Sequence, residues 1–140
     1  MIDAAVSRAV PWYYYDTHLY RFDIEELDLA YDVSFDIQKG VAEIFVTVEI
    51  DGEPSIEHIA VGYDIMSKIF HTLWAIIQDF IRRSNIAAIQ FGASAKEPSR
   101  VRLYATLAKQ MATYFGSEVS ITKSRYRKDI TYIVPVASRK

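Results

Sequence analysis

Hydrophobic and polar residues alternate along much of the N-terminal half of the chain. Between residues 27 and 37, apolar side chains occupy every second position, and mostly acidic or small side chains lie between them. Residues 41–50 resume the alternation after a turn at residues 38–40. A period of two is typical of β-strands with one buried face. With an extended segment from residue 19 and a further strand at residues 56–61, the pattern predicts an antiparallel meander.

The pattern changes to helical spacing in two later segments. Apolar residues recur every three or four positions from residue 65 to 81 and from residue 101 to 115, which predicts two amphipathic helices. Between them, residues 86–91 form a short apolar run that is typical of a strand buried on both faces. Two final strands are predicted at about residues 118–124 and 129–136. A strand, a long helix and another strand in succession predict a parallel pair inside a mixed sheet, so the fold class is α/β (α+β).

Composition excludes several classes of protein. The chain has 140 residues, 51% of them hydrophobic, and no cysteine, which fits a single folded domain over residues 1–140 and excludes disulfide frameworks and thiolate metal sites. The absence of cysteine favours a cytoplasmic location. No signal peptide is visible, and no apolar run suits a membrane span. The three histidines are isolated in sequence, so no metal site is predicted.

The net charge of −2 conceals two halves of opposite charge. Residues 1–65 carry three bases and 14 acids, a balance of −11, whereas residues 66–140 carry 13 bases and four acids, a balance of +9. Such asymmetry indicates either a charged partner or pairing between the halves. The overall acidity disfavours a dedicated nucleic-acid binder, although the basic segment at residues 125–128, which interleaves a tyrosine with three bases, keeps that alternative open.

A run of four aromatic residues precedes the acidic strands. It follows a segment at residues 2–10 with helical spacing that stops at Pro11, so residues 1–18 are predicted as a helical and aromatic arm. Consecutive aromatic side chains cannot all face one core, and exposed aromatics favour interfaces. We therefore expect contact with a protein partner, or a homodimer, through this run and the nearby acids. The candidate interaction residues are Trp12, Tyr13, Tyr14, Tyr15, Glu25, Glu26, Asp28, Asp32 and Asp36.

The second half of the chain carries a family resemblance. Residues 61–68 join a predicted strand to the long helix, and the second helix contains Leu103, Tyr104 and Leu107. This order of elements and these residues resemble the GNAT superfamily of N-acetyltransferases over residues 20–136. The segment from Phe91 to Tyr104 is also similar to small GNAT-like proteins encoded by bacteriophages. The resemblance implies a GNAT-like mixed sheet, with an N-terminal antiparallel meander followed by β-α-β-α-β-β.

The resemblance implies an acetyl-CoA site with Tyr104 as the acid that protonates the departing thiolate. Tyr104 also lies on the apolar stripe of its helix, where a core role is the alternative. Backbone N–H groups at a helix start suit a pyrophosphate, and a basic side chain near a helix start can grip a phosphate. The candidate cofactor-binding residues are Gly62, Tyr63, Ile65, Met66, Ser67 and Arg100.

The pyrophosphate segment departs from the family pattern. Of its small residues only Gly62 is present, and Asp64 places a negative charge there. Beside the nucleic-acid alternative, two functions of a GNAT-like chain therefore remain. The first is a non-catalytic GNAT-like protein that binds a protein partner with no cofactor. The second is an acetyl-CoA-dependent N-acetyltransferase that acts on an amine.

Overall fold

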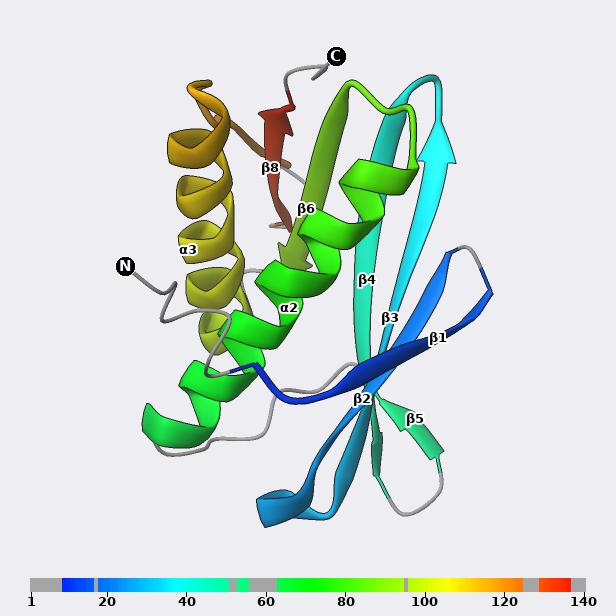
Figure 1. Ribbon diagram of the computed structural model, residues 1–140. Coiled ribbons are helices and arrows are strands. Elements are labelled where there is room, and N and C mark those ends of the chain that lie inside the picture. Colours follow the sequence, from blue (N-terminus) through cyan, green and yellow to red (C-terminus); the bar gives the residue numbers. More distant parts are fainter. Residues whose placement is uncertain are drawn as a thin grey trace. The chain divides into compact units, whose positions relative to one another are not determined.

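We describe a computed structural model of the chain (Figure 1). The structure describes residues 9–16, 18–50, 53–55, 63–94, 96–124 and 129–136. In chain order the elements are β1 (Trp12–Asp16), β2 (Leu19–Ile24), the 3-10 turn η1 (Glu25–Leu27), β3 (Leu29–Gln38), β4 (Val41–Ile50), β5 (Glu53–Ser55), α2 (Tyr63–Arg83), β6 (Ala88–Ser94), α3 (Pro98–Phe115), β7 (Ser120–Lys123) and β8 (Asp129–Pro135).

The described strands form a mixed, mostly antiparallel sheet. Their order is β1-β2-β3-β4-β6-β8-β7, and β5 pairs with β4. A parallel pair is present as predicted, because β4 and β6 run in the same direction, with Val41 opposite Ala88 and Ile44 opposite Phe91. The partner of β6 is β4, whereas the sequence pattern assigns that place to the strand at residues 56–61, directly before the long helix. The predicted α+β class is therefore correct. The strand predicted at residues 56–61 lies outside the described residues, as does nearly all of the predicted N-terminal helix.

The chain divides into two compact units. Unit 1 comprises Met1–Ser34 and Phe45–Ser84, and unit 2 comprises Phe35–Ile44 and Asn85–Lys140. The division passes through β3 and β4, so each long strand contributes to both units. Each unit has buried side chains from strands and from one helix, α2 in unit 1 and α3 in unit 2.

In unit 1, β2 and α2 supply much of the buried side-chain volume. Tyr20, Phe22 and Ile24 alternate along β2 and are all fully buried. The α2 stripe predicted from helical spacing is buried as well, with Leu73 and Ile77 at 0% exposure. Burial of one such side chain contributes roughly 1.5 to 3 kcal/mol. Apolar residues at every second position of β2 lie on one face of the strand, and those at helical spacing lie on one face of α2. Both of these apolar faces are buried in the core.

One interruption in unit 1 was not predicted. The segment expected to be extended from residue 19 to 37 breaks at η1, where Asp28 adopts the left-handed conformation with φ 54°. Its backbone N–H donates to the carbonyl of Glu25 at 3.1 Å. Aspartate tolerates this region better than most residues, so the acidic stretch turns here without a glycine.

In unit 2, the turn between β3 and β4, the helix α3 and the last two strands all lie close to the residues predicted for them. Lys39 and Gly40 both have positive φ, 53° and 81°, which suits a two-residue hairpin turn. The Gly40 carbonyl accepts from the backbone N–H of Ala87 at 2.7 Å, which holds the turn beside the approach to β6. Gly116, at φ 66°, ends α3 as predicted.

A polar network ties β2 to the end of α2 within unit 1. The buried Tyr20 hydroxyl donates to the Asp79 carboxylate at 2.9 Å. Arg83 donates from Nε to the same carboxylate at 2.9 Å and from a terminal nitrogen to the Tyr20 hydroxyl. Burial, reinforced by the bond to Asp79, raises the pKa of Tyr20 from 10.0 to about 12. Folding therefore favours the neutral hydroxyl, and this contribution to stability is lost as the pH rises from about 10 through 12.

Removal of the Tyr20 hydroxyl tests this network. We expect Tyr20→Phe to lower the free energy of unfolding by about 1 to 3 kcal/mol at neutral pH, because Asp79 and Arg83 lose a buried partner. Tyr14→Phe, at a ring that is 52% exposed, is the matched control and should change stability far less. Urea denaturation measures both, and equal stability of the two variants would refute the role assigned to the hydroxyl. The stability difference from wild type should also shrink between pH 10 and 12.

Candidate aromatic and acidic interaction surface

The aromatic run forms β1, at the edge of the sheet beside β2. Its register places Tyr13 opposite Arg21 and Tyr14 opposite Tyr20. Trp12 and Tyr14 share one face and both rings contact Tyr20, at centroid distances of 5.5 and 5.7 Å. The run predicted as an arm is therefore a strand, and two of its rings lie against the core.

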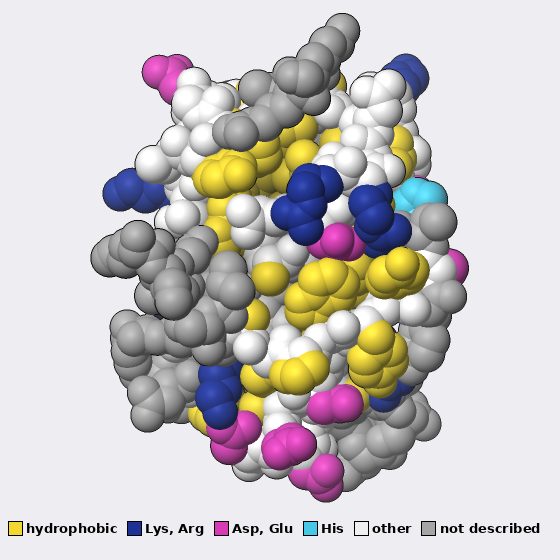
Figure 2. Space-filling view, in the orientation of Figure 1, with side chains coloured by type: hydrophobic (Ala, Val, Ile, Leu, Met, Phe, Trp, Pro, Cys, Tyr) yellow, Lys and Arg dark blue, Asp and Glu magenta, His cyan; other side chains and the backbone are white. Residues whose placement is uncertain are grey.

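Two of the β1 tyrosines are nevertheless accessible. Tyr13 is 46% exposed and Tyr14 is 52% exposed. The guanidinium of Arg83 lies 4.4 Å from the centre of the Tyr14 ring, a cation–π contact that restrains this exposed side chain. Figure 2 shows apolar side chains exposed between a pair of Lys or Arg side chains and a group of Asp and Glu side chains. The side chain of Tyr15 lies outside the described residues.

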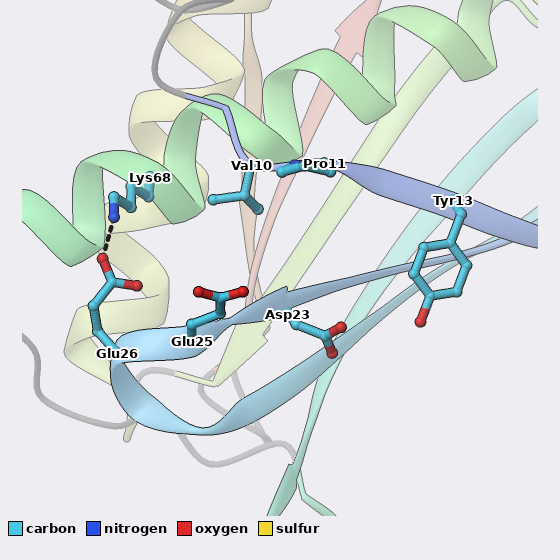
Figure 3. A pocket seen from close by; sticks show the side chains of 7 residues that line it. All are labelled: Val10, Pro11, Tyr13, Asp23, Glu25, Glu26 and Lys68. Atoms are coloured by element: carbon cyan, nitrogen blue, oxygen red, sulfur yellow. Dashed lines mark hydrogen bonds and ion pairs between the residues drawn. The ribbon is translucent and has the colours of Figure 1, made fainter.

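Three carboxylates lie near Tyr13 in unit 1. Asp23 follows Arg21 by two positions on β2, so it projects on the same face as Tyr13, while Glu25 and Glu26 begin η1. Together these side chains border a pocket of about 580 Å³. In Figure 3, Tyr13 and Glu25 point into the space between β1 and the end of β2. The lining residues are Val10, Pro11, Tyr13, Asp23, Glu25, Glu26 and Lys68.

Lys68, from the second turn of α2, reaches into this group. Its ammonium donates to the Glu26 carboxylate, and both side chains are partly exposed. This hydrogen bond is the main reason that the pKa of Glu26 is lowered from its usual value. Asp23 and Glu25 have no ion-pair partner among the residues that the structure describes. Among the described residues, the pocket therefore holds one carboxylate with an ion-pair partner and two without one.

The remaining predicted interaction acids lie elsewhere. Asp28 occupies the left-handed position after η1. Asp32 lies opposite Arg21, with the carboxylate 3.9 Å from the guanidinium. Asp36 belongs to unit 2 and accepts from the Gln38 side chain at 3.1 Å. The structure thus groups Tyr13 with Glu25 and Glu26, and adds Asp23 and Lys68, which sequence reasoning did not select.

The expected acetyl-CoA residues fall in two different units. Gly62 lies outside the described residues, as do the side chains of Tyr63 and Asp64. Three residues in the first turns of α2, in unit 1, have half-buried side chains: Ile65, Met66 and Ser67. Arg100 and Tyr104 belong to α3, in unit 2.

Tyr104 occupies a core position. Only 1% of it is exposed, its ring lies 5.4 Å from that of Phe91, and its hydroxyl accepts from Arg100 at 3.1 Å. Arg100 is itself 9% exposed, and its Nε lies 3.5 Å from the Glu97 carboxylate. The Arg100 guanidinium, which was expected to bind a phosphate, thus contacts Tyr104 on the same helix and Glu97 at the N-cap of that helix.

Other predicted chemistry can be located only in part. The basic segment at residues 125–128 lies outside the described residues. Arg82 and Arg83 both face the Asp79 carboxylate. Within the described ranges, no group of three or more His, Cys, Asp or Glu side chains could hold a metal ion. Neither described helix is long and apolar enough to cross a membrane.

Removal of the Lys68 ammonium tests the electrostatics of the pocket. We expect Lys68→Met to raise the pKa of Glu26 toward its ordinary value, because the hydrogen bond that favours the carboxylate is lost. An NMR titration of the Glu26 carboxyl group measures the shift. Lys109→Met, at an exposed lysine on α3, is the control and should leave the Glu26 titration unchanged. A Glu26 titration that is identical in wild type and Lys68→Met would contradict the contact.

Comparisons with known proteins add no relative. No family model, no curated protein and no solved structure matches this chain.

Proposed function

We propose that this chain is a non-catalytic protein-interaction domain. Its binding surface, called here the acidic–aromatic surface, consists of Tyr13, Tyr14, Asp23, Glu25 and Glu26. The observation that carries the proposal is the position of exposed tyrosines on an edge strand beside a pocket with two carboxylates that have no ion-pair partner among the described residues. Large aromatic side chains dominate binding energy at interfaces, and charged groups around them set the choice of partner.

The contacts beneath the surface support this role. Tyr14 is held against Arg83 and Tyr20, and Tyr20 is fixed by Asp79. A ring that is already restrained loses less conformational entropy when a partner covers it. The arrangement therefore favours association without a large change in the tyrosine side chains.

The charge of the surface indicates the kind of partner. A symmetric homodimer through this surface would place the same patch on both sides, so carboxylates would face carboxylates. Like charges at an interface cost free energy, whereas a basic partner would compensate Asp23 and Glu25. We therefore favour a different protein with a positively charged surface over the homodimer.

Substitution of one exposed tyrosine tests the proposed function. We expect Tyr13→Ala to lose a partner that wild-type protein retains from lysate of its source cells. Tyr114→Ala is the matched control, because Tyr114 is equally exposed at 46% but belongs to α3 in unit 2. Circular dichroism checks that both variants fold. Retention of the same partner by Tyr13→Ala and its loss from Tyr114→Ala would place the interface on unit 2 and reject the proposal.

The second candidate function is N-acetyl transfer from acetyl-CoA, in a GNAT-like fold. Three features support it: the strand order, the parallel β4–β6 pair, and the long helix that precedes β6. The burial of Tyr104 and its bond from Arg100 argue against Tyr104 as an acid that reaches a leaving thiolate. The interaction function is therefore the better supported of the two.

Thermal unfolding with acetyl-CoA separates the two functions. A ligand at 100 times its Kd adds about 2.7 kcal/mol of stability, and we expect no such shift at millimolar acetyl-CoA. Pyrophosphate at the same concentration controls for non-specific binding of anions. A saturable shift with acetyl-CoA alone would favour the acetyltransferase. In that case Tyr104→Phe should lower turnover with little change in affinity if Tyr104 is the acid.

A further inference from the structure

The pocket beside Tyr13 has the size of a ligand site. Its volume of about 580 Å³ lies within the range of roughly 300 to 1,000 Å³ that is usual for small-ligand pockets. Its walls differ in character. Val10, Pro11 and Tyr13 contribute apolar and aromatic surface, whereas Asp23 and Glu25 contribute carboxylates from the end of β2 and from η1 (Figure 3).

The charge of the lining favours a cation. Three carboxylates and one ammonium leave the lining side chains with a formal charge of −2. The chain itself places an ammonium on one of these carboxylates, in the contact of Lys68 with Glu26. Arg21, on the same strand as Asp23, has its guanidinium near Asp32. A second ammonium in the pocket would therefore meet Asp23 and Glu25 without displacing an ion pair among the described residues.

The geometry favours an organic cation over a metal ion. The three carboxylates border a space of several hundred Å³, and within the described residues they do not group as metal ligands. The aromatic face of Tyr13 attracts ammonium groups, and the apolar wall suits methylene groups. A lysine side chain combines a four-carbon stem with one compact ammonium, which matches these two kinds of wall.

We propose that this pocket receives a lysine side chain of the protein partner. The stem lies against Val10 and Pro11, and the ammonium lies between Tyr13 and the carboxylates of Asp23 and Glu25. This inference rests on the proposed interaction function, because it identifies which group of the partner the acidic–aromatic surface binds. It makes the pocket the position that selects a basic partner.

Titration with two small probes tests the chemistry of the pocket. n-Butylamine reproduces the lysine stem and ammonium, and n-butanol has the same stem without the charge. We expect n-butylamine to shift the NMR signals of Tyr13 and Glu25 in a saturable way, and n-butanol to leave them unchanged. Equal shifts from both probes, or n-butylamine shifts confined to α3, would overturn the proposal.

Affinity for a tetralysine peptide tests the residues. We expect the double variant Asp23→Asn/Glu25→Gln to bind tetralysine about fivefold or more weakly than wild type, because two carboxylate contacts are lost. The matched control is Asp36→Asn/Glu118→Gln, which removes the same charge from exposed acids of unit 2 and should bind as wild type does. Equal affinities of the two double variants would overturn the proposal, since only the overall charge would then matter.

The two proposals fail in different ways. If Tyr13→Ala loses the cellular partner but Asp23→Asn/Glu25→Gln retains both that partner and tetralysine, the interaction function stands and the lysine pocket is wrong. If Asp23→Asn/Glu25→Gln loses tetralysine while Tyr13→Ala retains the partner, the pocket binds cations but the proposed interaction function is wrong. Thermal unfolding of every variant confirms that the folded protein is compared.

Discussion

The carboxylate of Asp79 joins the contacts that hold Tyr14, one of the two exposed tyrosines of the acidic–aromatic surface. It accepts from the buried Tyr20 hydroxyl and from Arg83, and so joins the middle of β2 to the last turns of α2. Arg83 in turn lies over the exposed ring of Tyr14. A single partly buried acid therefore fixes a strand, a helix end and an accessible aromatic ring. Loss of one partner would leave the others with unmet hydrogen-bonding capacity, which is why such networks hold together cooperatively.

The acidic character of the N-terminal half has more than one structural consequence. Some of its carboxylates are compensated, as Asp32 is by Arg21 and Glu26 is by Lys68. Asp28 serves a backbone turn. Asp23 and Glu25 border the pocket without an ion-pair partner among the described residues. The net charge of a segment therefore says little about which of its acids can bind a partner. Local contacts decide that.

The elements with strong periodicity were predictable from sequence. The stripe of α2 and the β3–β4 hairpin with Gly40 follow from hydrophobic spacing and turn chemistry. Connection length predicts that the sheet contains a parallel pair, but not that β4 is the strand that pairs with β6. The pairing of β1 with β2 was not predictable, because an aromatic run has no period that distinguishes a strand from an arm. The break at η1 does leave a trace in the sequence, because the apolar positions change from even numbers up to Ile24 to odd numbers from Leu27 onward. An expectation of one extended segment from residue 19 to 37 overlooks this change of phase.

The candidate site was predicted only in part. Tyr13, Glu25 and Glu26 were selected as an exposed aromatic and nearby acids, and the structure places them around one pocket. Asp23 becomes adjacent to Tyr13 through the β1–β2 register, and Lys68 through the packing of α2 in unit 1. Both neighbours come together through tertiary structure, which the spacing of residues along a single sequence does not reveal. For Tyr104, the resemblance suggested chemistry, whereas its position on the apolar stripe of the helix predicted the burial that the structure has.

We propose above all that a cationic side chain of a partner lies against Tyr13 and the neighbouring carboxylates. Intermolecular NOE measurements on the protein with saturating tetralysine peptide test it most directly. The account predicts contacts between the lysine ε-methylene protons and the ring protons of Tyr13, with further contacts to the side chains of Val10 and Glu25. Lysine contacts only to α3 or to the β7–β8 strands, or no contact to Tyr13 at saturation, would contradict the account.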